Sequence, residues 1–298
     1  MKMNLDFCGI PMKNPLTTAS GTFNPRAHAD FYDLSILGAV TVKGVASTPW
    51  DGNPTPRIAE VYGGMLNSVG LQNPGAEAWI REELPFLQQY DTKIIVNLCG
   101  HTMDEYTEVA RMFRGVPVDL LELNISCPNV SAGGVTFGTD PQMVEKVVSA
   151  VKKEVDKPLI VKLTPNVTDI TEIARAAEAG GADALSLINT LLGMKIDIYR
   201  RKPVLARSVG GFSGPAVKPV AVRMVYQVAK AVDLPIIGMG GVMTGDDVAE
   251  FIMAGASMVA IGTAALVDPQ APVRILQELE EFCDKTGVKD IQEIRGII

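Results

Sequence analysis

The six residues Asn124-Ile125-Ser126-Cys127-Pro128-Asn129 place two amides and a thiol directly after an apolar run. That run, residues 118–123, has the composition of a buried strand, and Pro128 ends a strand ladder because it has no N–H to donate. Amide side chains donate and accept hydrogen bonds, which suits a planar polar ligand. A thiol ionises more readily than a hydroxyl, so Cys127 is a candidate base for proton transfer. The structural alternative is a small buried hydrophobe, and the hexapeptide alone does not decide between the two.

The composition describes a globular chain with no signal for a membrane or nucleic-acid partner. Of its 298 residues, 47% are hydrophobic and 20% are charged, and the formal net charge is −7. The acidic balance argues against nucleic-acid binding. No apolar run approaches the ~20 residues that span a bilayer, and residues 1–7 lack the apolar region of a signal peptide.

The cysteines and histidines form no metal or disulfide pattern. The four cysteines include no CxxC pair and are too dispersed for an iron–sulfur cluster, and two histidines are too few for a typical zinc site. We therefore expect no metal in this chain and a reducing, cytoplasmic location. Three cysteines are expected to be ordinary buried thiols: Cys8, Cys99 and Cys283. His28 and His101 also receive no functional role.

Short apolar runs alternate with amphipathic stretches along the whole chain. Strands buried on both faces are predicted at residues 16–19, 39–43, 94–98, 120–124, 159–163, 184–188, 236–239 and 258–261. Helices are predicted at residues 103–113, 141–155, 168–179, 215–232, 245–254 and 272–286. This alternation predicts an α/β fold, a (β/α)8 TIM barrel that forms one domain over residues 1–298. An open doubly wound sheet is the alternative, and it is disfavoured because no GxGxxG follows the first strand.

Three further segments complete the predicted barrel. The first sixteen residues suggest a hairpin that turns at residues 7–10 and covers one end of the barrel. Two long connections, residues 44–78 and 190–214, are expected to cover the opposite, active face as ordered loops.

Polar or glycine residues follow all eight predicted strands, at the end of a barrel that carries active sites. Lys43 and Lys162 lie at such ends, where a buried ammonium is costly unless an anion or an acceptor meets it. Pairing with internal carboxylates is the structural alternative for both lysines.

Glycines at the last two strand ends predict a phosphate site. Gly240-Gly241 and Gly262-Thr263 stand one β/α unit apart, and backbone N–H groups there can cradle a phosphate. The ligand would be a mononucleotide, flavin mononucleotide (FMN) or a sugar phosphate. Lys162, across the barrel from this end, could stabilise an anionic reduced flavin.

With these motifs the chain resembles the class 1 dihydroorotate dehydrogenases, which are FMN-dependent (β/α)8 barrels. The most specific segments are residues 67–75 (NSVGLQNPG), 124–129 (NISCPN) and 161–166 (VKLTPN), and the resemblance is strongest to the NAD-linked subclass 1B. It implies oxidation of (S)-dihydroorotate to orotate in de novo pyrimidine biosynthesis. It also implies a partner subunit that carries FAD and a 2Fe-2S cluster and passes electrons to NAD+, with a homodimer core inside a heterotetramer.

The resemblance also implies a role for each matching residue. Cys127 would remove the C5 proton, and the C6 hydride would pass to N5 of FMN. The expected substrate contacts are Lys43, Asn67, Ser68, Val69, Gly70, Leu71, Asn124, Asn189 and Thr190. The expected FMN contacts are Ser20, Lys43, Gly44, Asn97, Asn124, Lys162, Ile188, Gly214, Gly240, Gly241, Gly262 and Thr263. Separately from the resemblance, glycines within residues 126–138 suggest a lid that brings Cys127 to the substrate, and simple loop flexibility is the structural alternative.

Other functions stay open at this point. The chain could be a fumarate-linked subclass 1A enzyme, or another FMN barrel that acts on a dihydropyrimidine. A sugar-phosphate lyase or isomerase that uses Lys43 or Lys162 as a Schiff-base amine is a further alternative, as is a catalytically silent scaffold. The membrane-bound class 2 enzymes would have Ser at the position of Cys127.

Overall fold

A ring of parallel strands forms the centre of the computed structural model, which describes residues 1–125 and 137–298. Within these residues eight strands make one sheet in the order β3-β16-β15-β10-β9-β8-β7-β4. Their bounds are β3 (Leu16–Thr18), β4 (Ala39–Val45), β7 (Lys93–Leu98), β8 (Leu120–Asn124), β9 (Leu159–Lys162), β10 (Ala184–Leu187), β15 (Ile236–Met239) and β16 (Met258–Ile261). The predicted (β/α)8 barrel is confirmed, with each predicted strand in place to within two residues at either end.

Side chains link the two strands at the ends of this sheet. Thr18 Oγ1 donates to the Thr41 carbonyl at 3.0 Å and accepts from the Thr41 N–H at 2.9 Å. Thr17 and Thr41 also share a hydrogen bond between their hydroxyls at 3.0 Å. The threonines therefore connect β3 to β4 where the backbone ladder is interrupted.

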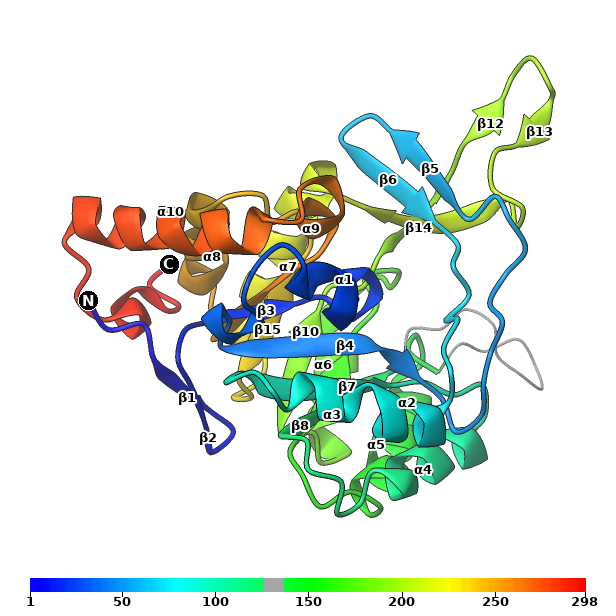
Figure 1. Cartoon of the computed structure of the whole chain (residues 1–298), viewed down its shortest axis with the longest axis horizontal. Helices are drawn as coiled ribbons and strands as arrows, with labels where there is room; N and C mark the ends of the chain where they lie inside the picture. The colour runs from blue at the N-terminus through cyan, green and yellow to red at the C-terminus, as the bar shows by residue number, and fades with distance from the viewer. Residues whose placement is uncertain (126–136) are drawn as a thin grey trace.

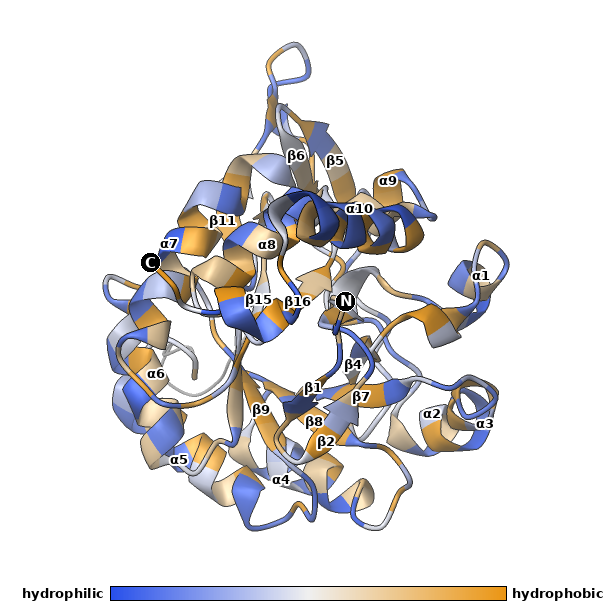
Figure 2. Cartoon of the chain, turned by 90° about the vertical axis from the view of Figure 1, so that its left-hand side faces the viewer, coloured by the Kyte–Doolittle hydropathy of each residue, from blue (hydrophilic) through white to orange (hydrophobic). Residues whose placement is uncertain are grey.

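Helices surround the ring, as Figures 1 and 2 show. The longer ones are α4 (Met103–Met112), α5 (Pro141–Lys152), α6 (Ile170–Ala179), α7 (Lys218–Ala229), α8 (Gly245–Met253) and α10 (Ala271–Thr286). The shorter ones are α1 (Pro25–Ala29), α2 (Ala76–Glu82), α3 (Leu84–Leu87) and α9 (Thr263–Val267), with 3-10 turns at Ser20–Thr22, Leu34–Ile36, Pro215–Val217 and Ile291–Ile294. Capping side chains fix several starts: Asp169 accepts from the Thr171 N–H at 2.8 Å before α6, and Thr244 from the Asp247 N–H at 3.2 Å before α8.

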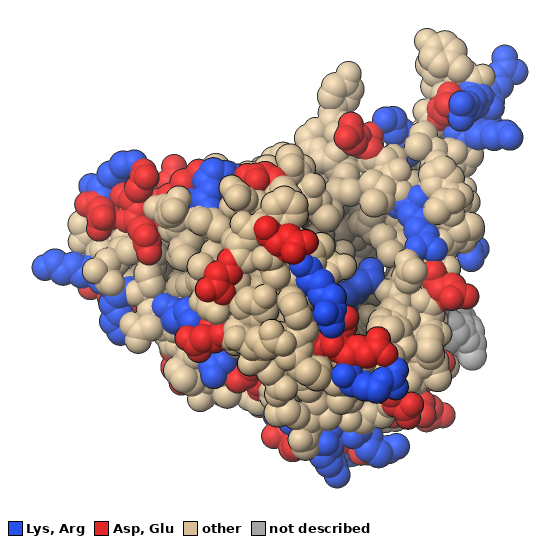
Figure 3. Space-filling model, in the orientation of Figure 1, with Lys and Arg blue, Asp and Glu red and all other residues tan. Residues whose placement is uncertain are grey.

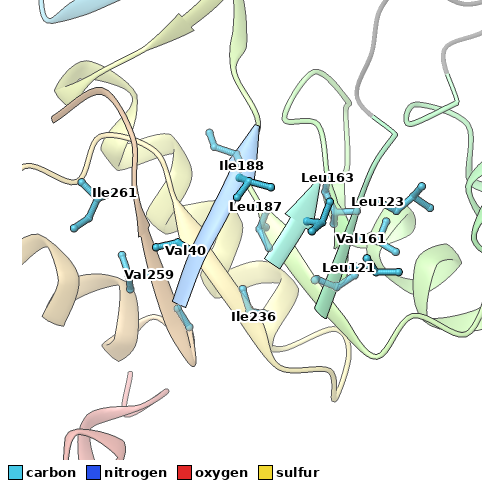
Figure 4. Packing of buried hydrophobic residues seen from close by; sticks show 14 of the residues in the cluster. Val40, Leu121, Leu123, Val161, Leu163, Leu187, Ile188, Ile236, Val259 and Ile261 are labelled. Atoms are coloured by element: carbon cyan, nitrogen blue, oxygen red, sulfur yellow. The ribbon is translucent and has the colours of Figure 1, made fainter. Parts of the chain in front are cut away.

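Alternation along each strand separates two cores. Leu121, Leu123 and Val161 point outward and pack among the helices (Figure 4). The intervening residues point into the barrel, so that Leu120 joins an apolar layer that includes Ile95 and Ile160. The next inward positions, two residues further along, are polar on β4, β7, β8, β9 and β10, whereas β15 and β16 carry Met239 and Ala260 there.

The N-terminal hairpin closes one end of the barrel, as predicted. It consists of β1 (Leu5–Phe7) and β2 (Ile10–Met12), and its turn residues Cys8 and Gly9 have φ of 56° and 80°. Phe7 and Met12 pack against the apolar layer inside the barrel. Both chain termini lie at this end, where Lys2 pairs with Asp290 at 2.6 Å (Figure 1).

The two long connections differ from the prediction, because they form a second sheet and not only loops. β5 (Ile58–Val61), β6 (Gly64–Asn67), β11 (Leu191–Met194) and β14 (Val209–Ser213) pair antiparallel in the order β11-β14-β6-β5. A ribbon of β12 (Ile196–Asp197) and β13 (Lys202–Pro203) projects beyond them (Figure 1). These strands are short, and β6, β11 and β14 contain glycine, so no apolar run revealed them. The sheet stands over the barrel end opposite the hairpin, on the expected face.

Candidate active site

A cavity of about 770 Å³ lies between the carboxyl ends of the barrel strands and the small sheet. Figure 3 shows this face hollowed between the two. The cavity wall contains every described residue that the sequence analysis placed in the site except Gly214. Residues from opposite ends of the sequence therefore meet at the end of the barrel that the fold predicts for an active site.

Polar side chains form a layer beneath this cavity. Glu122 lies on β8 with 1% of its surface exposed, and its Oε2 is 3.7 Å from Lys162 Nζ on β9. Asn97 Nδ2 donates to Glu122 Oε2 at 2.5 Å, and Ser186 Oγ donates to Glu122 Oε1 at 2.7 Å. Lys162 also donates to Ser20 Oγ at 3.3 Å. The predicted alternative of an internal carboxylate partner is thus correct for Lys162, and that partner contacts two cavity residues.

Lys43 reaches the cavity from β4, and its surroundings differ from those of Lys162. Among the described residues no carboxylate oxygen lies within 4.0 Å of its ammonium. Burial lowers the pKa of Lys43 from its ordinary value; Cys99 opposes this shift, and the positive charge of Arg57 adds to it. An anion bound next to Lys43 would offset the cost of burying its charge.

Amide side chains at three strand ends are held in place by hydrogen bonds. Asn189 Nδ2 donates to Asn124 Oδ1 at 3.4 Å, and Asn189 Oδ1 accepts from the Thr190 N–H at 2.8 Å. Tyr106 OH fixes the end of β8 by donating to the Asn124 carbonyl at 2.8 Å. Asn67, at the end of β6, donates to the Gly211 carbonyl at 3.4 Å. The small sheet and the barrel therefore present oriented amide side chains to the same cavity.

Glycines shape the opposite side of the cavity. Gly240 and Gly241 follow β15 with φ of 121° and 82°, a conformation that favours glycine. A Cβ on Gly241 would come within 2.8 Å of the Gly214 carbonyl oxygen. This packing explains why Gly214, expected in the site, lies behind Gly241 and not in the wall. Gly262 precedes α9, and Thr263 donates to Ser213 Oγ at 2.8 Å.

Several residues of the site received no role in the sequence analysis. Glu122 stands within an apolar run, Leu-Leu-Glu-Leu. A single charged residue in a predicted buried strand was the signal that could have marked it as part of the site. Asn53 donates to the Ser68 carbonyl at 3.2 Å, and Arg207 donates to Asn53 Oδ1 at 3.3 Å, so both support the predicted segment at 67–71. Asn166 donates to the Thr190 carbonyl at 3.0 Å and accepts from the Leu192 N–H at 3.0 Å. These three lie in connections whose sequences carry no periodic pattern.

Cys127 and residues 126–136 of the predicted lid lie outside the described residues. Of the other thiols, Cys99 and Cys283 are buried as expected, whereas Cys8 is half-buried in the hairpin turn. Burial, with the charges of Asp183 and Asp6, raises the pKa of Cys8 to about 12. Among the described residues no three His, Cys, Asp or Glu side chains are grouped to hold a metal ion.

Comparison with known proteins identifies the family to which this chain belongs. The family model described as dihydroorotate dehydrogenase matches residues 2–283. The chain belongs to the dihydroorotate dehydrogenase family.

Relatives in this dihydroorotate dehydrogenase family match along the whole chain. A protein of Alkaliphilus metalliredigens is 62% identical over 297 residues, covering 99% of this chain and 98% of its own. One of Alkaliphilus oremlandii is 63% identical over 295 residues with the same coverage, and one of Lachnoclostridium phytofermentans is 57% identical over the full length of both. Each carries the name dihydroorotate dehydrogenase B (NAD(+)), catalytic subunit.

The part of the chain that the structure describes has no helix both long enough and apolar enough to cross a membrane. Figure 3 shows Lys and Arg interspersed with Asp and Glu over most of the face in view.

Proposed function

We propose that this chain uses FMN to oxidise (S)-dihydroorotate to orotate in de novo pyrimidine biosynthesis, within the cytoplasm. The observation that carries the proposal is the gathering of the expected cofactor and substrate residues around one cavity. The names of the full-length relatives point to the same reaction.

The cavity wall fits FMN at both ends of that molecule. Gly240, Gly241, Gly262 and Thr263 offer a glycine-lined cradle next to the short helix α9, which suits a phosphate. At the other end, Asn97 Oδ1 is buried without a hydrogen-bond partner among the described residues. An unpaired buried oxygen is costly, and an N–H of a flavin ring would satisfy it.

The remaining FMN contacts that we propose hold the ring system. They are Ser20, Lys43, Gly44, Asn124, Lys162 and Ile188, all of them in the cavity wall. Gly214 supports the cradle from behind through its carbonyl. When bound, FMN supplies the acceptor for the hydride that leaves C6 of the substrate.

For the substrate we propose contacts from the barrel strand ends and from the small sheet and its connections. Lys43 binds the carboxylate of dihydroorotate, because an ammonium whose charge is disfavoured by burial gains most from an anion. Asn67 to Leu71, Asn124, Asn189 and Thr190 bind the pyrimidine edge, where amides match its alternating N–H and C=O groups.

Cys127 is the base that we propose for the C5 proton. The support for this role is the motif at residues 124–129 and the resemblance that it carries. Its thiolate takes the proton from C5, while Lys43 and the amides hold the ring in one orientation.

We further propose that electrons leave through a partner subunit. The relatives are named as catalytic subunits of NAD(+)-type enzymes. The partner would carry FAD and a 2Fe-2S cluster, on a homodimer core within a heterotetramer, and would reduce NAD+. A fumarate-linked enzyme without a partner is the alternative.

Turnover tests the proposal. Purified protein supplied with FMN and an artificial dye acceptor should convert (S)-dihydroorotate to orotate and leave dihydrouracil, which lacks the carboxylate, largely unreacted. A protein that binds no FMN, or that oxidises dihydrouracil as fast as dihydroorotate, would show that the assignment is wrong.

A further inference from the structure

Glu122 and Lys162 form a buried ion pair inside the barrel. Among residues 1–125 and 137–298, Glu122 is the one buried carboxylate side chain and Lys162 the one buried ammonium. Their atoms are 3.7 Å apart on neighbouring strands, and their side chains are 1% and 6% exposed. Even a paired buried charge is often no more stabilising than well-packed apolar residues of similar volume, so the pair requires an explanation beyond packing.

Glu122 itself is absent from the cavity wall, but two of its partners belong to that wall. Asn97 and Lys162 both line the cavity and both approach Glu122 Oε2. Ser186 Oγ holds the other carboxylate oxygen at 2.7 Å. The carboxylate is therefore fixed on one side by Ser186 and in turn fixes two residues that face the ligand.

The orientation of Asn97 follows from this arrangement. An ionised carboxylate only accepts hydrogen bonds, so the Asn97 amide must turn its NH2 group toward Glu122. Its oxygen then points the other way, toward Gly44, where a Cβ would come within 2.8 Å of it. This leaves the buried, unpaired Oδ1 as an acceptor for a ligand N–H.

The Glu122 carboxylate also changes the net charge that the site presents to a ligand. Lys162 would present a full positive charge to a flavin, and the Glu122 carboxylate offsets part of it from 3.7 Å. Positive charge near the pyrimidine side of a flavin stabilises its anionic reduced form. The carboxylate therefore opposes that stabilisation.

We propose that Glu122 is a positioning residue that holds Lys162 and Asn97 and limits the positive charge that they present to the flavin. The inference rests on the proposed function, since it requires FMN in the cavity. It predicts that neutralising Glu122 makes the bound flavin a stronger electron acceptor.

Sulfite binding to the FMN-bound protein measures this charge without turnover. Sulfite adds reversibly to N5 of oxidised flavin and leaves negative charge on the pyrimidine side, so its affinity rises with local positive charge. Glu122→Gln keeps the size of the side chain and should tighten sulfite binding about tenfold, the order expected for one charge removed inside a protein. Unchanged or weaker sulfite binding would overturn the proposal.

Two matched variants control this measurement. Asp119→Asn removes one negative charge just before β8, at the end of the strand that lies away from the cavity. There Asp119 accepts a hydrogen bond from the Ile94 N–H at 2.8 Å. Ser186→Ala removes one hydrogen bond to Glu122 and keeps its charge. Both should leave sulfite affinity within about twofold of the parent. An equal gain in Asp119→Asn would mean that overall charge, and not Glu122, sets the effect.

A double-mutant cycle keeps the proposal testable if Glu122→Gln folds poorly. Lys162→Met leaves the Glu122 carboxylate buried without its cation, so the melting temperature of the FMN-free full chain should fall. Adding Glu122→Gln should recover part of that loss. Two losses that simply add would show that the groups do not act as a charged pair, and would also overturn the proposal.

The outcomes separate this inference from the function on which it rests. A parent protein that takes up no FMN would refute the proposed function. A parent that binds FMN and oxidises dihydroorotate, but whose sulfite affinity ignores Glu122, would refute only the role of Glu122.

Discussion

Individual residues in the cavity show how similar side chains acquire different properties. Lys43 and Lys162 both stand on barrel strands, but Lys162 lies 3.7 Å from a carboxylate, whereas burial lowers the pKa of Lys43. Lys43 is therefore the lysine whose charge depends most on a bound anion.

The pH dependence of orotate binding should reveal the lowered pKa of Lys43. Because its pKa is lowered, the ammonium is present below that pKa and is lost as the pH rises through it, at a lower pH than for an ordinary lysine. Orotate affinity should therefore weaken on the alkaline side. Lys43→Met should weaken binding by about tenfold to a hundredfold, the contribution of a charge-assisted hydrogen bond, and remove this alkaline dependence. A titration of the flavin absorbance with orotate measures both, with Lys202→Met on the exposed ribbon as the control. A Lys43→Met variant that keeps the parent affinity would contradict the role.

Substitution of Cys127 tests the proposed base. Cys127→Ser should slow flavin reduction by dihydroorotate about a hundredfold or more while FMN stays bound, because a hydroxyl is a much weaker acid than a thiol. Cys8→Ser is the matched control, since Cys8 lies in the hairpin at the opposite end and burial raises its pKa to about 12. Rapid mixing under anaerobic conditions gives the rate, and a parent rate in Cys127→Ser would exclude the assignment.

Among the elements, the turns after β15 and β16 connect backbone conformation to ligand binding. Gly241 has φ of 82°, and a Cβ there would meet the Gly214 carbonyl at 2.8 Å. Gly241→Ala should lower FMN affinity at least tenfold and cost about 1–3 kcal/mol of stability through strain. Gly115→Ala is a matched control, because Gly115 has φ of 72° but nothing within 4 Å of its Cβ position. FMN titration of both variants measures the difference; equal losses of affinity would show that the cradle does not depend on Gly241.

The start of α8 supplies a test of acid stability. Burial opposes ionisation of Asp247, but hydrogen bonds from Lys218 and from the backbone N–H groups of Met243 and Thr244 lower its pKa overall. A lowered carboxyl pKa adds stability above the pKa of the unfolded chain, and this is lost as the pH falls through the folded value. Asp247→Ala should therefore cost about 1 kcal/mol at neutral pH and less in acid. Denaturant unfolding at several pH values checks this, with the exposed Asp246→Ala as the comparison. A cost independent of pH would contradict it.

The elements also show what the sequence could and could not predict. Barrel strands such as β8 and β16 are continuous apolar runs, so their bounds were predicted without error. The small sheet was missed because β6 and β14 are short, rich in glycine and only partly buried. The site residues on strand ends were found because polar groups there break an apolar pattern. Glu122 was missed because its partners come from other strands, and pairing across strands is a property of the fold.

On the scale of the whole molecule, one end of the barrel is closed by the hairpin and the other carries the cavity under the small sheet (Figure 1). The relatives are named as catalytic subunits of NAD(+)-type enzymes, so the proposed route for the electrons runs through a partner subunit. The chain alone should therefore oxidise dihydroorotate with a dye but reduce NAD+ at a negligible rate. Purification from its native cells, with assays for iron and FAD, checks for the partner. Protein without either, whose reduced flavin is reoxidised by fumarate, would replace the NAD-linked assignment with the fumarate-linked one.

The proposed function requires FMN and dihydroorotate to occupy the same cavity and to exchange two electrons there. Anaerobic mixing of the FMN-bound protein with a slight excess of (S)-dihydroorotate tests it most directly. We expect the visible flavin absorbance to bleach and one orotate to form for each flavin reduced. A flavin that stays oxidised, or that bleaches without forming orotate, would contradict it.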